Sequence, residues 1–276
     1  AHTLRSDRRV DVTMGGEGSL EIDVLSTGFG FVLQSMLSTV SGPTQIGATN
    51  AYTTTVESAS DANSDSYTVQ IQRVNASGVS QAFTHHGGVI TSWTLSQEVG
   101  GLLNATLNFD FEDVDTSTAA GTPAYAADNF PYDWTMACAS INGVDTDLRS
   151  MSLSADLGFN TDRRFLRCSS LKRQPVRTNI PSYEGELSLD WSSNTEYDMF
   201  VSGAIVPIVM TFDSLVDIDG GNNAKMVVTL PACQFTGNSP VASIGEIPSL
   251  SLPFKVLDNG TDAAVQITYT SSDSAL

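Results

Sequence analysis

The sequence predicts an all-β fold, and three observations support this class. Apolar and polar residues alternate with a period of two in several runs, which is typical of strands with one packed face. Stretches rich in Gly, Asn, Asp, Ser and Pro separate these runs. Only two segments have the apolar spacing of a helix. The 276 residues, 41% of them apolar, suffice for one large core or two ordinary ones.

The strand pattern is clearest in four runs of the sequence. Residues 103–112 alternate almost perfectly between large apolar and polar side chains. The same alternation occurs in residues 19–24, 186–191 and 250–256. Each run predicts a strand that packs one face in a core and leaves the other in water.

The two helical segments have apolar residues at i, i+3, i+4, i+7 and i+8. This spacing predicts one helix over residues 29–37 and another over residues 194–201. Pro207 follows the second stripe closely, so the last apolar positions, Ala204 and Ile205, belong either to the helix or to the next strand.

Both helices belong to an internal repeat. Residues 16–37 and 183–205 each run through a strand, a short loop and a helix at nearly the same spacing. We interpret this as a tandem duplication, although shared turn chemistry among β proteins is the alternative. The repeats are expected over residues 1–115 and 133–276, with a polar linker over 116–132. Three further pairs of blocks follow the same order in both halves: 4–9 with 166–173, 83–88 with 235–238, and 101–113 with 245–258.

The two predicted repeats differ at their beginnings. Strand-like residues 134–141 and 148–159 precede the basic element of the second repeat, whereas nothing precedes Leu4 in the first. Loss of these strands would leave an unpaired neighbour. We therefore expect that the gene encodes residues before Ala1, or that a neighbouring chain fills the gap.

The charge balance is strongly acidic. Thirty-one acids against 13 bases give a net charge of −18, and only three of the bases are lysines. A basic nucleic-acid-binding surface is therefore excluded as the main function. Acid excess with few lysines fits a protein dissolved in concentrated salt, and it fits equally a GC-rich genome that favours Arg.

Candidate catalytic and metal-binding residues are few. His85 and His86 are adjacent, and neighbours on a strand point to opposite faces, so the pair chelates poorly. Residues 217–223 resemble a calcium loop but lack its spacing and closing Glu, so we expect a hairpin turn. No nucleophile elbow, phosphate loop or Ser–His–Asp arrangement is present. The sequence indicates a protein that is not an enzyme and has no metal or other cofactor.

No apolar run approaches the length of about 20 residues that a membrane span needs.

The sequence has three cysteines, Cys138, Cys168 and Cys233. The cysteines have neither the spacing of a zinc site nor that of a disulfide framework. We therefore expect three buried thiols.

Several blocks occur in an order found in one known family. A basic element is followed by a Gly-x-Leu-x-Ile strand, a helix entry, a central hairpin and a later hairpin. On these residues the sequence resembles the tail tube (major tail) proteins of long-tailed, non-contractile viruses of bacteria and archaea. The resemblance runs over almost the whole chain, and its specificity lies in the order of the blocks. Family members usually have further residues before the basic element, which here is almost the first feature. The blocks are residues 4–9, 18–22, 27–30, 83–106, 141–144 and 150–156.

The resemblance implies a β-sandwich or partial barrel flanked by a helix, and here one short helix per repeat. It implies a structural protein of the virion tail that self-assembles into stacked rings, whose strands close a hollow tube for the genome. Its partners would be further copies of the chain, tail terminator and tail tip proteins, a tape measure protein in the lumen, and double-stranded DNA that passes without specific binding. No membrane partner is implied. If each chain supplies two units, three chains complete a ring with pseudo-six-fold symmetry, and hexameric rings are the alternative.

Two other classes of function remain open at this point. A virion decoration protein or a cell-surface adhesin would share the acidity and the strands, but not the helix after residues 18–22. A β-sandwich hydrolase would need a pocket with converging acids, which the sequence does not locate.

A channel for DNA needs a neutral or acidic wall, because Lys and Arg would hold the phosphates. The polar sides of the predicted strands supply such residues, and the alternative is that they are ordinary solvated surface. The candidate lumen-lining residues are Glu21, Asp23, Asn104, Asn108, Asp110, Glu112, Glu186 and Asp190.

Overall fold

The computed structural model describes residues 15–59, 66–125, 129–237, 239–240, 245 and 247–276. Strands dominate, and every pair of neighbouring strands is antiparallel, which confirms the all-β prediction. The basic element expected over residues 4–9 lies outside the described residues.

The first repeat predicted from the sequence contains seven strands and one helix. They are β1 (Gly16–Asp23), α1 (Gly30–Leu37), β2 (Ser38–Gln45), β3 (Tyr52–Ser58), β4 (Tyr67–Val74), β5 (Ser80–Glu98), β6 (Asn104–Phe111) and β7 (Asp113–Asp115).

The rest of the chain begins with a short 3-10 turn at Trp134–Met136 and holds ten strands and the second helix. They are β8 (Ala137–Ile141), β9 (Val144–Thr146), β10 (Leu148–Asp156), β11 (Phe159–Asn160), β12 (Val176–Arg177), β13 (Ser182–Asp190), α2 (Thr195–Ser202), β14 (Ile205–Asp219), β15 (Asn222–Phe235), β16 (Ser249–Val256) and β17 (Gln266–Ser271).

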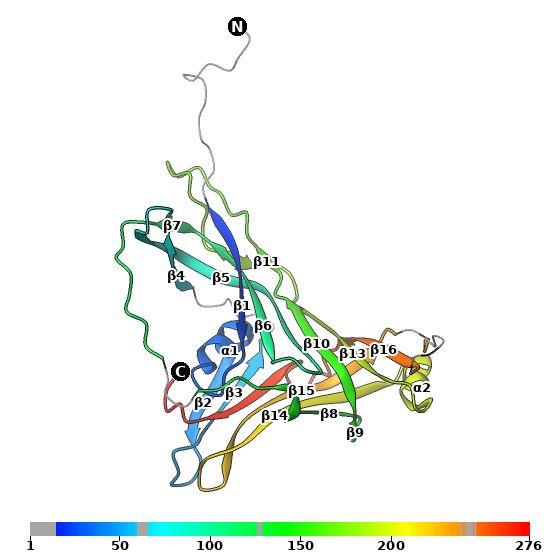
Figure 1. Ribbon diagram of the computed structural model, residues 1–276. Helices are drawn as coiled ribbons and strands as arrows, with labels where there is room; N and C mark the ends of the chain where they lie inside the picture. The colour runs from blue at the N-terminus through cyan, green and yellow to red at the C-terminus, as the bar shows by residue number, and fades with distance from the viewer. Residues whose placement is uncertain (1–14, 60–65, 126–128, 238, 241–244, 246) are drawn as a thin grey trace.

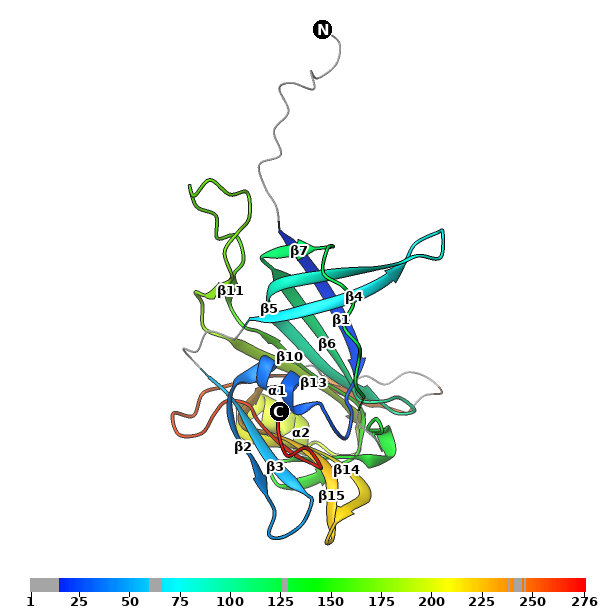
Figure 2. The same cartoon turned by 90° about the vertical axis from the view of Figure 1, so that its left-hand side faces the viewer.

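The strands form two packed layers (Figure 1). The first layer has the order β1-β6-β5-β10-β13-β16. The second has the order β2-β3-β17-β15-β14-β8-β9, and the end of β15 pairs with β16 and so joins the two layers. The first half of β5 leaves the layers and pairs with β4 and β7, and these strands project away from the sandwich in Figure 2.

The core lies between the layers and runs through both halves of the chain without a break. Side chains of β5 and β10 face those of β14 and β15 around a small cavity of about 10 Å³. Helix α1 closes one side of the sandwich with Leu33 and Met36, which are fully buried. Trp93 of β5, only 1% exposed, donates a 3.0 Å hydrogen bond from Nε1 to the Met36 carbonyl. This bond fixes the helix to the sheet.

The elements predicted from alternation and helical spacing are confirmed. The four clearest runs are β1, β6, β13 and β16, and the two predicted helices are α1 and α2. Ile205 begins β14, so the end of the second apolar stripe belongs to the next strand. Residues 217–223 form the expected hairpin turn between β14 and β15, with Gly220 and Gly221 at positive φ. No helix among the described residues is both long and apolar enough to span a membrane.

The expectation of three buried thiols is wrong for two of them. Cys233 is buried in the core, whereas Cys138 and Cys168 are exposed. Cys138 faces outward from β8 near the edge of its sheet, and Cys168 lies in the loop between β11 and β12. Neither position could be assigned from spacing alone, because exposure here follows from long-range strand order.

The strand pairs β1–β6 and β13–β16 have the same register. Gly18 lies opposite Phe109 and Leu20 opposite Leu107. In the other pair, Gly185 lies opposite Phe254 and Leu187 opposite Leu252. Each pair therefore places a glycine and a leucine, two residues apart, across from a phenylalanine and a leucine.

The two glycines have different surroundings, which gives a matched test of packing. A Cβ on Gly185 would lie 2.4 Å from the Ser152 carbonyl oxygen and 2.4 Å from the Phe254 ring, whereas one on Gly18 would lie 3.6 Å from Phe111. We expect Gly185→Ala to lower the free energy of unfolding by about 1–3 kcal/mol through overpacking. Gly18→Ala should leave it unchanged or slightly raised. Denaturant unfolding measures both, and equal effects would contradict this account of the β13–β16 packing.

Candidate functional site

One face of the first layer is polar across all six strands. Side chains of directly paired residues point to the same side of a sheet, so the register defines rows that cross the layer. We call the surface formed by the following two rows the polar face. The first row is Glu21, Thr106, Thr94, Ser154, Glu184 and Lys255, and the second is Asp23, Asn104, Ser96, Ser152, Glu186 and Pro253.

The opposite side of the same strands is the packed side. Between the polar positions lie Leu107 of β6, Leu95 of β5, Leu153 of β10 and Leu187 of β13, each at most 5% exposed. The hydrophobic effect therefore turns the apolar positions inward and leaves the polar face open. Alternation in the inner strands sets this orientation, whereas Leu20 of β1, opposite Leu107 on the same side, is 40% exposed.

The polar face is hollowed, and it brings four of the eight candidate residues together. Glu21, Asp23, Asn104 and Glu186 line one open groove of about 700 Å³. Asn108 lies further along β6, exposed, and donates a 2.9 Å hydrogen bond to the Ser92 hydroxyl of β5. Alternation predicted that each of these five positions faces away from the packed side of its strand, and their place in a lumen stays a prediction.

The charge of this surface is negative. Among the described residues, Glu21, Asp23 and Glu186 make no ion pair. The carboxylate of Glu186 accepts a 2.6 Å hydrogen bond from Ser251. Lys255, the one basic residue of the two rows, lies 2.9 Å from Glu184, so its charge is balanced.

Two of the eight candidates are covered by another part of the chain and lie outside the open groove. Asp110 is 6% exposed, and its Oδ2 lies 2.5 Å from Nζ of Lys172, which is itself buried. Glu112 is partly buried, with Oε1 3.5 Å from a guanidinium nitrogen of Arg167. Both partners come from the loop of residues 161–174, which covers this end of β6. We call this loop the basic arm.

Asp190, the remaining candidate, is neutralised by Arg149 of β10. Both carboxylate oxygens accept from the guanidinium, one of them from Nη2 at 3.1 Å. These hydrogen bonds hold the pKa of Asp190 below its usual range. Asp190 therefore adds little net charge to the polar face.

The sequence analysis missed the centre of the polar face. Serines and threonines of β5 and β10 fill the rows between the acids, and Glu98 ends β5 beside them. A signal was present, because hydroxyl residues alternate with apolar ones over 92–96 and 150–154. Small hydroxyl residues carry no charge, and a search for acids passed over them.

The histidines form no metal site among the described residues, where no group of three or more His, Cys, Asp or Glu side chains converges. His85 instead packs its ring against Phe111, with ring centroids 4.7 Å apart. Burial and the nearby Arg73 lower the pKa of His85, which favours the neutral ring.

Comparison with known proteins gives one match that covers most of the chain. The model of a family described as phage tail tube protein matches residues 4–256. This confirms the resemblance on which the sequence analysis relied. A search of curated proteins finds no match.

The burial of the Lys172–Asp110 pair predicts a large cost for breaking it. Lys172→Met leaves an uncompensated buried carboxylate and should lower the free energy of unfolding by about 3–5 kcal/mol. The double variant Lys172→Met with Asp110→Leu should recover most of this loss, because no buried charge remains.

Lys255→Met, which breaks the exposed pair with Glu184, is the control and should cost less than about 1 kcal/mol. Denaturant unfolding of the four proteins measures the differences. Similar losses at Lys172 and Lys255 would show that the basic arm does not bury the pair in solution.

Proposed function

The chain belongs to the phage tail tube protein family, and we propose how copies of it build a tube. Members of this family are structural components of the virion tail and assemble as tubes of one repeated protein. Copies of the chain self-assemble into stacked rings, and the polar face lines the hollow centre through which the genome passes. The observation that carries this proposal is the polar face itself. Five adjacent strands, β1, β6, β5, β10 and β13, present hydroxyl, amide and carboxylate groups in two rows, and β16 adds Lys255 and Pro253.

Such a wall suits the passage of DNA. Duplex DNA carries one negative charge per about 1.7 Å of axis, and Lys or Arg on the wall would bind it by releasing counterions. On the polar face, Lys255 is paired with Glu184 and the neighbouring Arg149 with Asp190, while Glu21, Asp23 and Glu186 stay negative. The wall therefore repels phosphate weakly and offers it no site of attachment.

The edge of the first layer supports closure of a ring. β13 has neighbours on both edges, β10 and β16, whereas its counterpart β1 pairs with β6 alone among the described residues. A free edge strand is a template for pairing with another chain. The sheet can therefore continue past β1 into a second copy, and a cyclic ring would leave no edge unpaired.

The common register of β1–β6 and β13–β16 supports a tandem duplication. In the chain, β10 lies between β5 of the first repeat and β13 of the second, and so joins one repeat to the next within a single sheet. If the chain is a tandem duplication, a junction of the same kind also forms between the second repeat of one copy and the first repeat of the next. Three chains then give six equivalent units around the axis.

We expect purified protein to form tubes with a central channel and three subunits per ring. Negative-stain microscopy shows whether tubes form, and native mass spectrometry of released rings counts the subunits. Six chains per ring would refute duplication as the device that builds the ring. Isolated globules under all conditions would refute the tube itself.

Reversing charge on the polar face should slow DNA delivery without preventing assembly. In Asp23→Arg with Glu186→Arg, two cations in one row would bind passing phosphates. Release of DNA from virions carrying the variant should slow at low salt and recover in high salt, because the attraction is screened.

The matched control is Glu196→Arg with Asp198→Arg on α2, which makes the same change of charge away from the polar face. It should release DNA at the normal rate. Normal release by the polar-face variant at low salt would mean that this face does not meet the DNA.

A further inference from the structure

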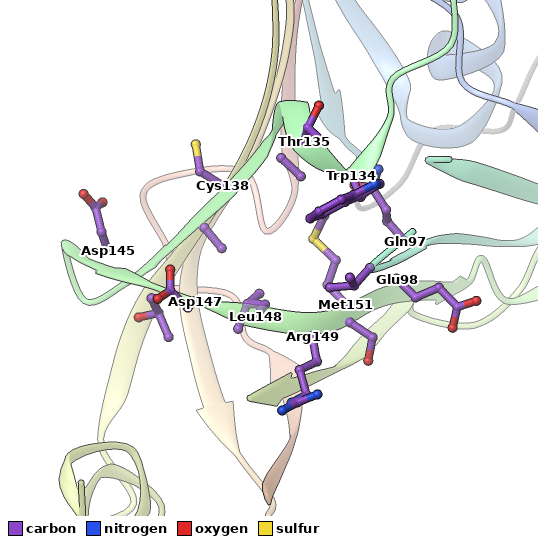
Figure 3. A pocket seen from close by; sticks show the side chains of 15 residues that line it. Gln97, Glu98, Trp134, Thr135, Cys138, Asp145, Asp147, Leu148, Arg149 and Met151 are labelled. Carbon is purple, nitrogen blue, oxygen red and sulfur yellow. The ribbon is translucent and has the colours of Figure 1, made fainter. Parts of the chain in front are cut away.

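A second hollow lies outside the polar face, at the edge where the chain enters β10. The 3-10 turn, the β8–β9 hairpin, the end of β5 and the start of β10 enclose an open groove of about 510 Å³. Figure 3 shows Trp134 and Met151 together on one side of it and the carboxylates of Asp145 and Asp147 on the other. We call it the edge groove.

The edge groove has an apolar floor and an acidic rim. Trp134 is 46% exposed and Val99 57% exposed, and both line the groove. Glu98, Asp145 and Asp147 are exposed on its rim. An apolar surface with a charged border is typical of a site that another polypeptide covers.

The basic arm has the complementary composition. It contains five of the 13 basic residues of the chain and a single acid, Asp162. At its centre, Leu166 is fully exposed, and Phe165 is 56% exposed with its ring under the Arg163 guanidinium, 5.8 Å from Cζ to the ring centroid. The Lys172–Asp110 pair anchors the base of the arm and keeps this apolar tip outside the sandwich.

The arm and the groove lie at opposite ends of β10. Leu148, the first residue of the strand, lines the groove, and the chain enters the arm after the strand ends at Asp156. Nine residues of strand span about 30 Å. In Figure 1 the arm is at the top of the molecule and β9 is near the bottom. Complementary surfaces at opposite ends allow head-to-tail contacts, which build an open stack when the rotation between copies does not close a ring.

We propose that the basic arm of one copy binds in the edge groove of a copy in the next ring. This rests on the proposed assembly into stacked rings and names the contact that stacks them. Phe165 and Leu166 pack on the floor beside Trp134. Arg163 and Arg173 of the arm, which make no ion pair among the described residues, face the acids of the rim.

Two native thiols test the contact directly. Cys168 lies in the arm and Cys138 lines the groove, both exposed, whereas Cys233 is buried. We treat assembled tubes with a short bis-maleimide, to which each thiol adds without an oxidant. Denaturing electrophoresis should then show a ladder that continues beyond the number of chains in one ring. Cys138→Ser and Cys168→Ser should each abolish the ladder, and Cys233→Ser should keep it.

The other outcomes are distinguishable. Tubes that form normally but give no ladder, or a ladder that survives Cys168→Ser, would overturn the arm–groove contact while leaving the tube intact. A ladder that stops at the size of one ring would place the contact within rings and also overturn it. If no tubes form from the unmodified chain, the proposed function fails first, and the contact fails with it.

A second variant tests the contact without chemistry on cysteine. Phe165→Asp with Leu166→Asp places two charges against the acidic rim, and both positions are exposed, so the subunit should still fold. We expect single rings in place of tubes, with at least a tenfold loss of tube mass in a sedimentation assay. Ile180→Asp, at another exposed apolar position, is the control and should stack normally. Normal stacking of the arm variant would overturn the proposal.

Discussion

The structure depends on keeping six strands in register with the same side inward. Because side chains alternate along a strand, a slip of one residue in any pair would expose its leucines and bury its serines and acids. The row from Glu21 to Lys255 crosses five strand pairs without a slip at those positions. One hydrophobic constraint therefore creates both the core and the polar face, and the polar face requires no separate design.

Much of this arrangement could be predicted from the sequence, because alternation and helical spacing are local properties. They located β1, β6, β13 and β16 and both helices. They could not show that β5 continues for 19 residues, since its first part, residues 80–88, lacks the regular alternation of residues 92–96. The pairing of β10 between β5 and β13 also lies beyond local pattern, because it depends on which edges the rest of the fold leaves open.

The candidate site shows the same division. Glu21, Asp23, Asn104 and Glu186 meet in one groove, because they occupy equivalent positions on strands that the fold places in one layer. Asp110 occupies the same side of β6 as Asn104 in the alternating pattern, but it is buried. The reason is that Lys172, 62 residues away in the sequence, contacts it from a loop. Arg149 neutralises Asp190 in a similar way. The alternation of apolar and polar residues therefore predicted the side of the sheet on which each acid lies. Whether that acid is neutralised depends on cations that are distant in the sequence.

The separation of charge within the chain links transport to assembly. A chain of net charge −18 places five of its 13 bases in the basic arm, at the end of β6 and beyond the two rows that are proposed to meet DNA. Cations on that face would retain the genome, whereas cations on the arm can bind only a surface that presents acids, such as the rim of the edge groove. At 1 M salt, charges are screened beyond about 3 Å, so ionic attraction between rings weakens there. Phe165 and Leu166 are then decisive, because burial of their apolar surface does not depend on screening and is strengthened by salts that are excluded from protein surfaces. A contact with both components can hold across dilute and concentrated salt, while the cations of the channel wall, Lys255 and Arg149, stay paired with Glu184 and Asp190.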